Sequence, residues 1–437
     1  MKTFLLFGFT FVTSLVLSQN IHRCVTQEAI QYQESITPGF INQVQNVFES
    51  SKAYSQNNQE KAGSIYNIPV VVHIVYNTPE QNLDDSVIIN QIQVLNEDYN
   101  RLNADTVNMR SEFDIIKGSP QINFTLAQID ENGAPTTGIT RTSTSTTSFG
   151  SLAFITGDFT DLEKVKSTMD GGQDPWNQDR YLNIWVCNMS INIFGTETTA
   201  LLGYATPPAG LPNWPAGSTP NLNDGVVIQY QAFGSNNPNI LDVGTGAVDV
   251  RGRTATHEIG HYLGLRHIWG DGDCTAQDGI DDTPNADAQS DQDCDITKNT
   301  CTDNIQGVDL PDMIENYMDY SAETCQNSFT QGQVDLMHGV LENERYDLVH
   351  NNAASVTSLN ELALNIAPNP ANAFIRYQSD EKIESIKIIS IDGQVVKSIE
   401  AQSTNGMINT SALAKGFYYV VISSSNNQTA SKSLVIQ

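Results

Sequence analysis

Hydrophobic positions follow strand and helix spacings in turn over roughly the first 350 residues. The run "IPVVVHIVYN" at 68–77 is apolar enough for a buried strand, and "INFTLAQID" and "YLNIWVCNMS" indicate further strands. The stretch 85–99 has helical spacing instead, and Gln331–Arg345 is expected to form another helix. The apolar residues with this spacing are Val87, Ile88, Ile92, Leu95 and Tyr99. The pattern predicts a mixed α/β domain, with a twisted sheet and helices, over residues 62–350.

The pattern changes near residue 360. Short alternating runs follow one another there, namely "FIRYQ", "SIKIISI", "QVVKSIE", "FYYVVISS" and "KSLVIQ". Asp392-Gly393 and Asn405-Gly406 are typical hairpin turns. We therefore expect a linker at 351–358 and a small all-β sandwich domain over 359–437.

The beginning of the chain has the pattern of an exported protein. Lys2 precedes an apolar run from Phe4 to Leu17, and Ser18 is a small residue suited to cleavage. Residues 1–18 are thus predicted to be a secretory signal peptide, and no other stretch approaches the roughly 20 apolar residues of a membrane span. Residues 19–61 are polar and rich in Gln and Asn. They indicate a pro-segment with one weak helix near Ile41–Phe48, followed by a soft linker.

The charge balance narrows the choice of partners. The chain carries 22 Lys and Arg against 50 Asp and Glu, a formal net charge of −28. A protein this acidic does not bind nucleic acid through general electrostatics. The excess carboxylate is compatible with an extracellular location and with calcium binding, and an exported chain can form disulfides.

The strongest chemical signal is "HEIGHYLGLRH" at 257–267. On a helix, His257 and His261 lie one turn apart on the same face and can reach one metal ion. Gly264 can end the helix in a left-handed turn, so that His267 supplies a third nitrogen. Three His ligands leave the fourth position open, as in a catalytic zinc site, and Glu258 lies beside them. The alternative, a helix with ordinary surface histidines, does not explain this combination.

The full string His-Glu-x-x-His-x-x-Gly-x-x-His resembles the metzincin metalloproteases, and "NYMDYS" resembles their Met-turn, with Met318 as its methionine. Together with "DDTP", these stretches resemble the pappalysin family in its bacterial and archaeal branch. The resemblance covers about residues 62–350. "LLGYATPP" and "DGVVIQYQAFG" resemble that family's upper-rim segments, where an edge strand pairs with the substrate backbone. The astacins, another metzincin branch, fit less well.

The resemblance implies a zinc endopeptidase that cleaves protein and peptide substrates. His257, His261 and His267 would hold Zn²⁺, Glu258 would transfer the proton, and Tyr320 would stabilise the tetrahedral intermediate. Met318 would form a hydrophobic floor under the metal. Glu323 matches an acidic position at the base of the S1′ pocket, which predicts a preference for Arg or Lys at P1′.

Six cysteines are present: Cys24, Cys187, Cys274, Cys294, Cys301 and Cys325. Four of them lie in or near an acidic segment, 271–304, that is predicted to be a long loop. These four allow three pairings, and the resemblance implies Cys274–Cys301 and Cys294–Cys325. It also implies that Cys24 occupies the fourth zinc position of a zymogen, as a cysteine switch. Alternatively, Cys24 pairs with Cys187, which is otherwise expected to be a buried free thiol.

Two further expectations concern release of the pro-segment and calcium. Lys52 and Lys61 are the only basic residues between Cys24 and the first strand, so they are the candidate sites for self-cleavage. "CTAQDGIDDTPNADAQSDQDCD" offers many hard oxygen ligands for Ca²⁺. The candidate ligands implied by the resemblance are Gln277, Asp278, Asp281 and Thr283. The alternative is an acidic loop held only by disulfides.

The tail has a signature of its own. "LNELALNIAPNPANAFIRY" and the final strand "SKSLVIQ" resemble the C-terminal sorting domain of the type IX secretion system. That machinery is therefore an expected partner, and secretion the expected destination. A sugar-binding module is the alternative, but Tyr418 and Tyr419 would point to opposite faces of one strand. For the whole chain, the competing hypothesis is a non-enzymatic secreted adhesin built on a metzincin scaffold.

Overall fold

The computed structural model describes residues 22–57, 65–150, 159–193, 196–199, 201–209, 223–242, 246–350, 364–390, 395–424 and 429–436. The chain divides into two compact units, one made of residues 1–126 and 138–350, the other containing residues 351–437. The predicted signal peptide, Lys61, the linker at 351–358 and the Asp392-Gly393 turn lie outside the described residues. Within the described residues, no helix is both long and apolar enough to cross a membrane.

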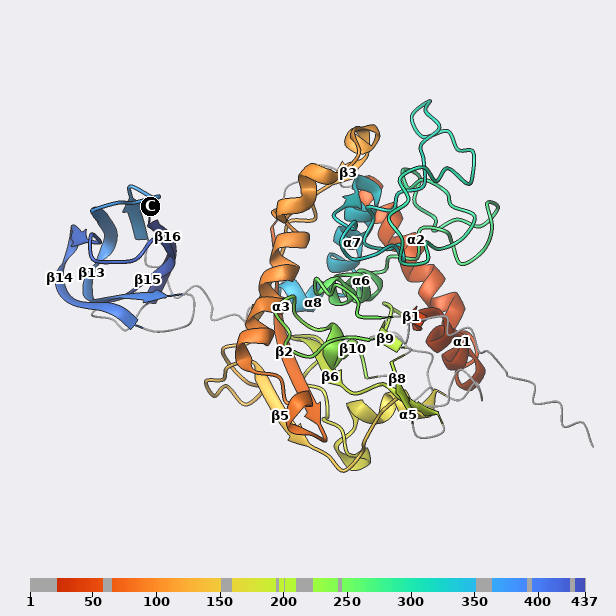
Figure 1. Ribbon diagram of the computed structural model, residues 1–437, viewed down its shortest axis with the longest axis horizontal. Helices are drawn as coiled ribbons and strands as arrows, with labels where there is room; N and C mark the ends of the chain where they lie inside the picture. Colours follow the sequence, from red (N-terminus) through yellow and green to blue (C-terminus); the bar gives the residue numbers. More distant parts are fainter. Residues whose placement is uncertain are drawn as a thin grey trace, which may run out of the picture. The chain divides into compact units, whose positions relative to one another are not determined.

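A seven-stranded sheet organises the first unit (Figure 1). Its order is β1 (His22–Cys24), β9 (Leu201–Ala205), β10 (Val226–Gln229), β6 (Leu182–Cys187), β2 (Tyr66–Tyr76) and β4 (Ile122–Leu126). The seventh strand, β5 (Ile139–Ser143), pairs with the second half of β2. All neighbours run parallel except β9 and β10, which are antiparallel.

The alternating side chains of these strands build a separate core on each face of the sheet. Ile184 and Val186 of β6 belong to the larger core, together with α3 (Asp85–Asp98) and α6 (Arg253–Tyr262). Trp185 and Cys187 point to the opposite core, under α5 (Thr160–Glu163). The predicted strands and helix of this region are confirmed. Because β6 is covered on both faces, it is apolar except for Asn183, which is buried and hydrogen-bonded to His73, and it does not alternate.

The remaining elements of the first unit surround the sheet. Helix α7 (Gln331–Leu341) begins at Thr330, whose side chain forms a capping box with Gln333, and α8 (Tyr346–His350) follows it. The helix predicted over Gln331–Arg345 is thus confirmed but ends earlier, at Leu341, and a separate short helix follows it. Two small ribbons complete the unit: β3 (Lys117–Gly118) with β11 (Phe329–Thr330), and β7 (Ile191–Ile193) with β8 (Thr196–Thr198).

The helix predicted near Ile41–Phe48 is confirmed, but it is longer than expected, and the soft linker predicted after it is wrong as far as Asn57. The segment forms β1, then α1 (Thr26–Ile36), then the long helix α2 (Phe40–Asn57). Glu34 accepts the backbone N–H groups of Gly39 and Ile41 at the start of α2, and these bonds lower the pKa of its carboxyl group. Helix α2 packs along α7 (Figure 1). Tertiary burial thus supplies the stability that the polar sequence does not show locally.

The acidic segment 271–304 contains no helix or strand, as predicted, and every residue of it is described. The structure contains the disulfides Cys274–Cys301 and Cys294–Cys325, which are the pairings that the family resemblance implies. The two bridges interleave along the chain. They cross-link a segment that has few apolar residues to hold it.

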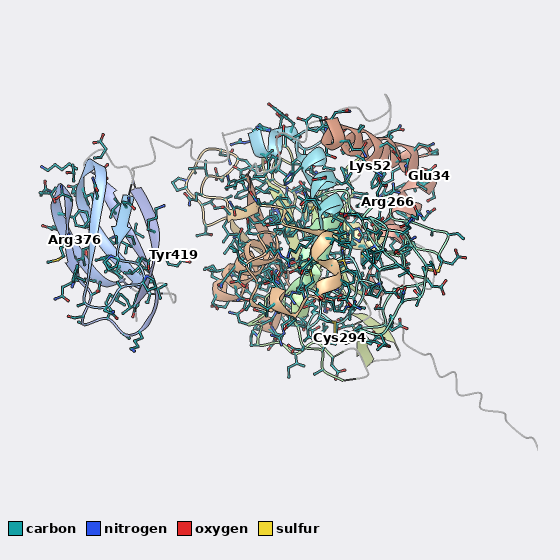
Figure 2. The ribbon with its side chains drawn as sticks, turned by 90° about the horizontal axis from the view of Figure 1, so that it is seen from above. Glu34, Lys52, Arg266, Cys294, Arg376 and Tyr419 are labelled. Carbon is teal, nitrogen blue, oxygen red and sulfur yellow. A yellow bond between two sulfur atoms is a disulfide. The ribbon has the colours of Figure 1, made fainter. Side chains whose placement is uncertain are left out.

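The second unit is an antiparallel β domain of β12 (Leu364–Ala367), β13 (Phe374–Ser390), β14 (Val395–Asn409), β15 (Gly416–Ser424) and β16 (Thr429–Ile436). "FIRYQ" and "SIKIISI", expected as two strands, form the single strand β13. The Asn405-Gly406 turn is also wrong, because β14 continues through it and pairs Gly406 with Tyr377. Register shifts between Gln378 and Ile383 bend β13, so one of its edges pairs first with β12 and then with β15. Arg376 and Tyr419 project from this unit (Figure 2).

Candidate active site

Helix α6 carries the histidine motif, and three glycines fit it into its surroundings. Gly264 has a φ of +93°, the left-handed turn that sends the chain back toward the helix. Gly260 leaves room for the Met-turn, because an added Cβ would overlap Sδ of Met318. Gly203 of β9 leaves room for Glu258 on the other side of the helix, because an added Cβ would lie 2.7 Å from Cγ of Glu258. The motif is therefore held between strand β9 and the segment around Met318.

The three imidazoles converge on one point. Nε2 of His261 lies 3.1 Å from Nε2 of His257 and 3.1 Å from Nε2 of His267. The opposite ring nitrogens meet acceptors: Nδ1 of His257 and of His261 lie 2.7 Å and 2.8 Å from the backbone oxygens of Tyr317 and Leu265. An acceptor at Nδ1 makes that nitrogen the donor and turns the lone pair of Nε2 toward the shared point.

The donor set fits a zinc ion. Nitrogens of the three histidines and Sγ of Cys24 all lie within 4.8 Å of one another, and all four residues are buried. Burial and the neighbouring His267 lower the pKa of His261 to about 3, so this ring is neutral, the state that binds a metal. Three nitrogens and one sulfur match the ligands and the four-fold coordination that zinc prefers. Among the described residues this is the one such cluster of histidine, cysteine and carboxylate side chains.

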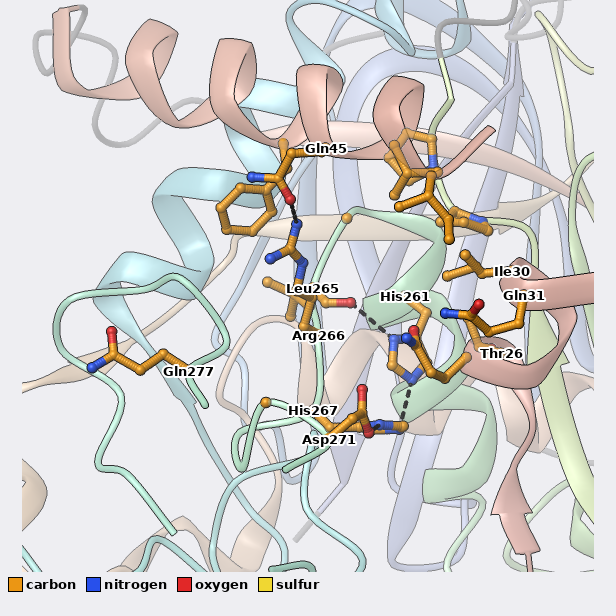
Figure 3. Close-up of a pocket in the computed structure, with 18 residues that line it drawn as sticks. Thr26, Ile30, Gln31, Gln45, His261, Leu265, Arg266, His267, Asp271 and Gln277 are labelled. Atoms are coloured by element: carbon orange, nitrogen blue, oxygen red, sulfur yellow. Dashed lines mark hydrogen bonds and ion pairs between the residues drawn. The ribbon is translucent and has the colours of Figure 1, made fainter. Parts of the chain in front are cut away.

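Two residues that the sequence reasoning missed orient the third histidine. Oδ1 of Asp271 lies 2.6 Å from Nδ1 of His267, and the indole of Trp269 stacks on the same ring at 4.3 Å between centroids (Figure 3 shows His267 and Asp271). Trp269 also meets the ring of Tyr320 edge-on at 4.8 Å. Metal-bound histidines commonly donate their other ring nitrogen to a carboxylate. Asp271 follows His267 by only four residues, so this rule could have identified it from the sequence.

Glu258 is fully buried beside the histidine cluster. Its Oε2 accepts hydrogen bonds from Sγ of Cys24 at 3.3 Å and from Oγ1 of Thr26 at 3.2 Å. Thr26 was also missed, and its hydroxyl further accepts the backbone N–H of Ala205 in β9. The segment after residue 22 therefore covers both the carboxylate and the point on which the histidines converge.

Tyr320 already donates to a peptide carbonyl at this site. Its hydroxyl lies 3.0 Å from the backbone oxygen of Cys24. Burial raises the pKa of Tyr320 well above its usual value, so the hydroxyl keeps its proton and remains a donor. The side chain is thus placed to hydrogen-bond a carbonyl oxygen near the histidines.

Strand β1 places Cys24 by pairing with the edge of the sheet, where Cys24 lies opposite Gly203 of β9. Burial, and then the Glu258 carboxylate, raise the pKa of the Cys24 thiol, whereas a bound cation would favour its thiolate. Cys24 and Cys187 are both free and buried, so the alternative disulfide is absent. They belong to cores on opposite faces of the sheet, which explains why they do not meet.

Glu323 lies at the beginning of α6. Its carboxylate accepts the backbone N–H groups of Arg251, Arg253 and Thr254 and the Thr254 hydroxyl. It therefore caps the helix that carries the histidines. Next to it lies a small cavity of about 10 Å³. The cavity is lined by Arg253, Thr254, His257, Glu258, Tyr320 and Gln326.

The four candidate calcium ligands divide into two pairs. Asp278 and Thr283 are buried and their side chains interact with each other, and Oδ2 of Asp278 and Oγ1 of Thr283 have no other hydrogen-bond partner among the described residues. Oδ1 of Asp282 is a third such oxygen nearby in the chain. Gln277 and Asp281 are exposed instead, and Asp281 pairs with Lys52 of α2 at 2.9 Å.

A larger cavity of about 230 Å³ lies at the other end of α6 (Figure 3). His261, Leu265, Arg266 and His267 form its inner wall, and residues of α1 and α2 form its outer wall. The two cavities thus flank the histidine cluster from opposite ends of the helix.

Comparisons with known families give two matches. Residues 231–342 match the peptidase M43 model described as pregnancy-associated plasma protein-A, and residues 365–437 match the secretion system C-terminal sorting domain. Curated relatives include an extracellular metalloprotease of Verticillium alfalfae, 35% identical over 40% of this chain and 53% of its own. Another, from Arthroderma benhamiae, is 38% identical over 31% of this chain and 42% of its own. The chain thus spans about half the length of these relatives, or less.

Solved structures extend the similarity. Mature mirolysin of Tannerella forsythia in complex with a cleaved peptide is 41% identical, with a TM-score of 0.56, over 68% of this chain and 99% of that one. A promirolysin variant from the same organism is 37% identical, with a TM-score of 0.58, over 77% and 99%. The precursor form covers more of this chain than the mature form does.

Proposed function

Because this chain belongs to the pappalysin family of metzincin metalloproteases, we propose that it is a secreted zinc endopeptidase made as an inactive precursor. The observation that carries this proposal is the convergence of three histidine nitrogens and the Cys24 sulfur beside Glu258. Cleavage of casein, its loss with a zinc chelator and its return with added zinc would test it. A non-enzymatic adhesin on the same scaffold would show no cleavage at all.

The proposed chemistry assigns one task to each residue of the site. When bound by His257, His261 and His267, a zinc ion supplies Lewis-acid activation of water and of the scissile carbonyl. Glu258 takes the proton from the attacking water and delivers it to the leaving amine. Tyr320 donates its hydroxyl to the carbonyl oxygen as negative charge develops there, and its bond to the Cys24 carbonyl supports this role.

Substrate binding would use the edge of β9. Strand β1 occupies that edge in the precursor, and its departure would leave the N–H and C=O groups of β9 without their partner. An extended peptide can pair with such an edge and place its carbonyl between the histidines and Tyr320.

The charges near the small cavity beside Glu323 favour a basic substrate residue at P1′. The guanidinium of Arg253 faces two carboxylates, Asp98 at 3.5 Å and Asp105 at 2.7 Å, and the Glu323 carboxylate adds a third negative charge nearby by accepting the backbone N–H of Arg253. The local charge is therefore negative, and a substrate Arg or Lys would offset it.

Glu323→Gln is expected to lower the ratio of kcat/KM for P1′-Arg over P1′-Leu peptides by about tenfold, equivalent to about 1.4 kcal/mol. The ratio is insensitive to the amount of folded enzyme. Glu112→Gln, which removes one charge from an exposed position, should leave the ratio as it is. Equal cleavage of both peptides by the wild-type enzyme would contradict the proposed pocket.

This preference also bears on release of the pro-segment. Nζ of Lys52 is held by the backbone oxygen of Gly279 and by Asp281, and the preceding Ser51 is fully buried. Cleavage before Lys52 would require α2 to unfold locally. Of the two basic candidates, we therefore favour Lys61.

We further propose a calcium ion at the buried oxygens of Asp278, Asp282 and Thr283. Burial raises the pKa of Asp278 to about 7, so without a cation the stability contributed by its protonated form is lost as the pH rises through 7. Calcium favours the ionised form and should therefore stabilise the protein more at pH 8 than at pH 5.5.

Removal of calcium at pH 8, with zinc retained, is expected to lower Tm by roughly 5 °C, and by less at pH 5.5. Asp278→Asn should abolish the difference between the two pH values, whereas Asp273→Asn in the same loop should preserve it. If the Tm does not change with calcium at either pH, the proposed calcium site is wrong.

Export is assigned to the second unit, which matches the sorting-domain model. We propose that this unit carries the folded protease through the type IX machinery. Deletion of residues 359–437 is expected to retain active protease in the periplasm of the native host, as measured by fractionation. Secretion of the truncated chain into the medium would instead favour a binding module.

A further inference from the structure

Helix α2 places one aromatic ring in a fitted slot on the catalytic unit. The guanidinium of Arg266 lies 4.0 Å above the ring centre of Phe48. On Gly279, an added Cβ would lie 2.8 Å from Cζ of the same ring. Phe48 is only 4% exposed. The ring thus fills a slot bounded by a cation and by a residue that has no side chain.

The polar neighbours of the ring also belong to the pro-segment. Nη2 of Arg266 donates to Oε1 of Gln45 at 2.7 Å, and Figure 3 shows this bond bridging the cavity. Lys52, one turn after Phe48, anchors on Gly279. Figure 2 shows Lys52 and Arg266 at this side of the unit. The hydrogen bond and the ring contact of the Arg266 guanidinium are both with α2, whereas Asp271 and Asp278 of the catalytic unit also interact with its charge. Removal of the pro-segment would therefore uncover the guanidinium face that now covers Phe48 and vacate the slot.

The slot belongs to the active-site cleft. Phe48 and Arg266 line the same cavity as His261 and His267. This cavity lies at the end of α6 opposite Glu323, where the P1′ residue is proposed to bind. Because the scissile bond would lie at the histidines between the two ends, the slot is on the non-primed side.

We propose that this slot is a non-primed specificity subsite, in which Arg266 binds an aromatic side chain of the substrate in the place vacated by Phe48. A cation over a ring face and a backbone beneath it favour an aromatic group over an aliphatic one of similar size. The inference rests on the proposed protease function and adds a second determinant to it. The pro-segment would then block both the scissile-bond position, through Cys24, and this subsite, through Phe48.

The test uses mature enzyme and fluorogenic peptides with Arg at P1′ and either Phe, Leu or Ala at P2, P3 or P4. At one of these positions, Phe is expected to raise kcat/KM over Ala by roughly tenfold, and over Leu by a smaller factor. Arg266→Leu should reduce the Phe-to-Ala ratio to about one, and Arg266→Lys should reduce it in part. Arg141→Leu, at an exposed arginine of β5 that pairs with Asp85, should keep the full ratio.

Binding of the same peptides to Glu258→Gln protein separates this inference from the proposed activity, because it needs no turnover. A Kd for the Phe peptide roughly tenfold below that of the Ala peptide, lost on adding Arg266→Leu, would support the subsite even if no peptide is cleaved. Cleavage without a Phe preference at any non-primed position would overturn the subsite and leave the protease assignment intact. A Phe preference that survives Arg266→Leu would overturn it equally.

Discussion

Glu258→Gln is expected to reduce kcat/KM for peptide cleavage by at least about 1,000-fold while the protein still binds zinc. The side chain is fully buried next to the converging histidines, and its Oε2 lies 3.3 Å from the Cys24 sulfur of that cluster. The amide keeps the shape of the side chain but cannot take a proton from water. Rates on a fluorogenic peptide and zinc content after dialysis, both for mature protein, measure the two halves of the prediction.

A matched variant separates proton transfer from metal binding. Asp271 accepts Nδ1–H of His267 and lies in the same cleft, so Asp271→Asn should lower zinc affinity by about 10- to 100-fold and recover much of its activity at high zinc. Glu258→Gln should gain nothing from added zinc. Near wild-type turnover by zinc-loaded Glu258→Gln would show that the proposed mechanism is wrong.

Cys24→Ala is expected to turn a latent precursor into one that cleaves itself. In the structure the sulfur lies with the three histidines and donates to Glu258, so it blocks the place where water must bind. If the lost contact is worth about 3 kcal/mol, the uncovered fraction of the precursor rises roughly 100-fold. The time course of precursor cleavage on a gel, and peptide hydrolysis by the freshly purified precursor, measure the change.

Cys187→Ala is the control, because Cys187 is also a buried free thiol but lies in the core on the other face of the sheet. This variant should stay latent. The double variant Cys24→Ala/Glu258→Gln should stay intact, which would show that the cleavage comes from the protein's own site. The Cys24→Ala precursor could instead remain uncleaved and inactive while the mature enzyme is active. In that case β1, α1 and α2 suffice to block the site, and the proposed cysteine switch is wrong.

Local patterns identified the elements whose stability and chemistry are encoded within a few residues. The spacing of Val87, Ile88 and Leu95 predicted α3, and the buried run at 68–77 predicted β2. The histidine motif needed only the 3.6-residue period of a helix and one glycine turn. For that reason the three histidines and Glu258 could be named before the fold was known, and the structure brings all four together.

Long-range packing decided what the sequence could not. Helix α2 is polar, and only Ile41–Phe48 was predicted to be helical, yet it continues to Asn57 because Val47, Phe48 and Ser51 are buried against the catalytic unit. Likewise β13 and β14 run through an expected break and an expected turn, because pairing with neighbouring strands outweighs the turn preference of Asn405-Gly406. Such contacts join residues far apart in the chain and leave no local pattern.

The same division holds within the site. By itself, the sequence identified the candidate chemical groups: the histidine motif, the Glu258 carboxylate, Met318 and a cysteine in the preceding segment. Only the tertiary structure decided which groups surround these residues, such as Trp269 stacked on His267 and Arg266 over Phe48. Metal ligands must be specific residue types at set spacings, so they can be recognised from the sequence alone. A slot, a stacked ring or a strand-edge contact is defined by shape, and shape exists only once distant segments have packed.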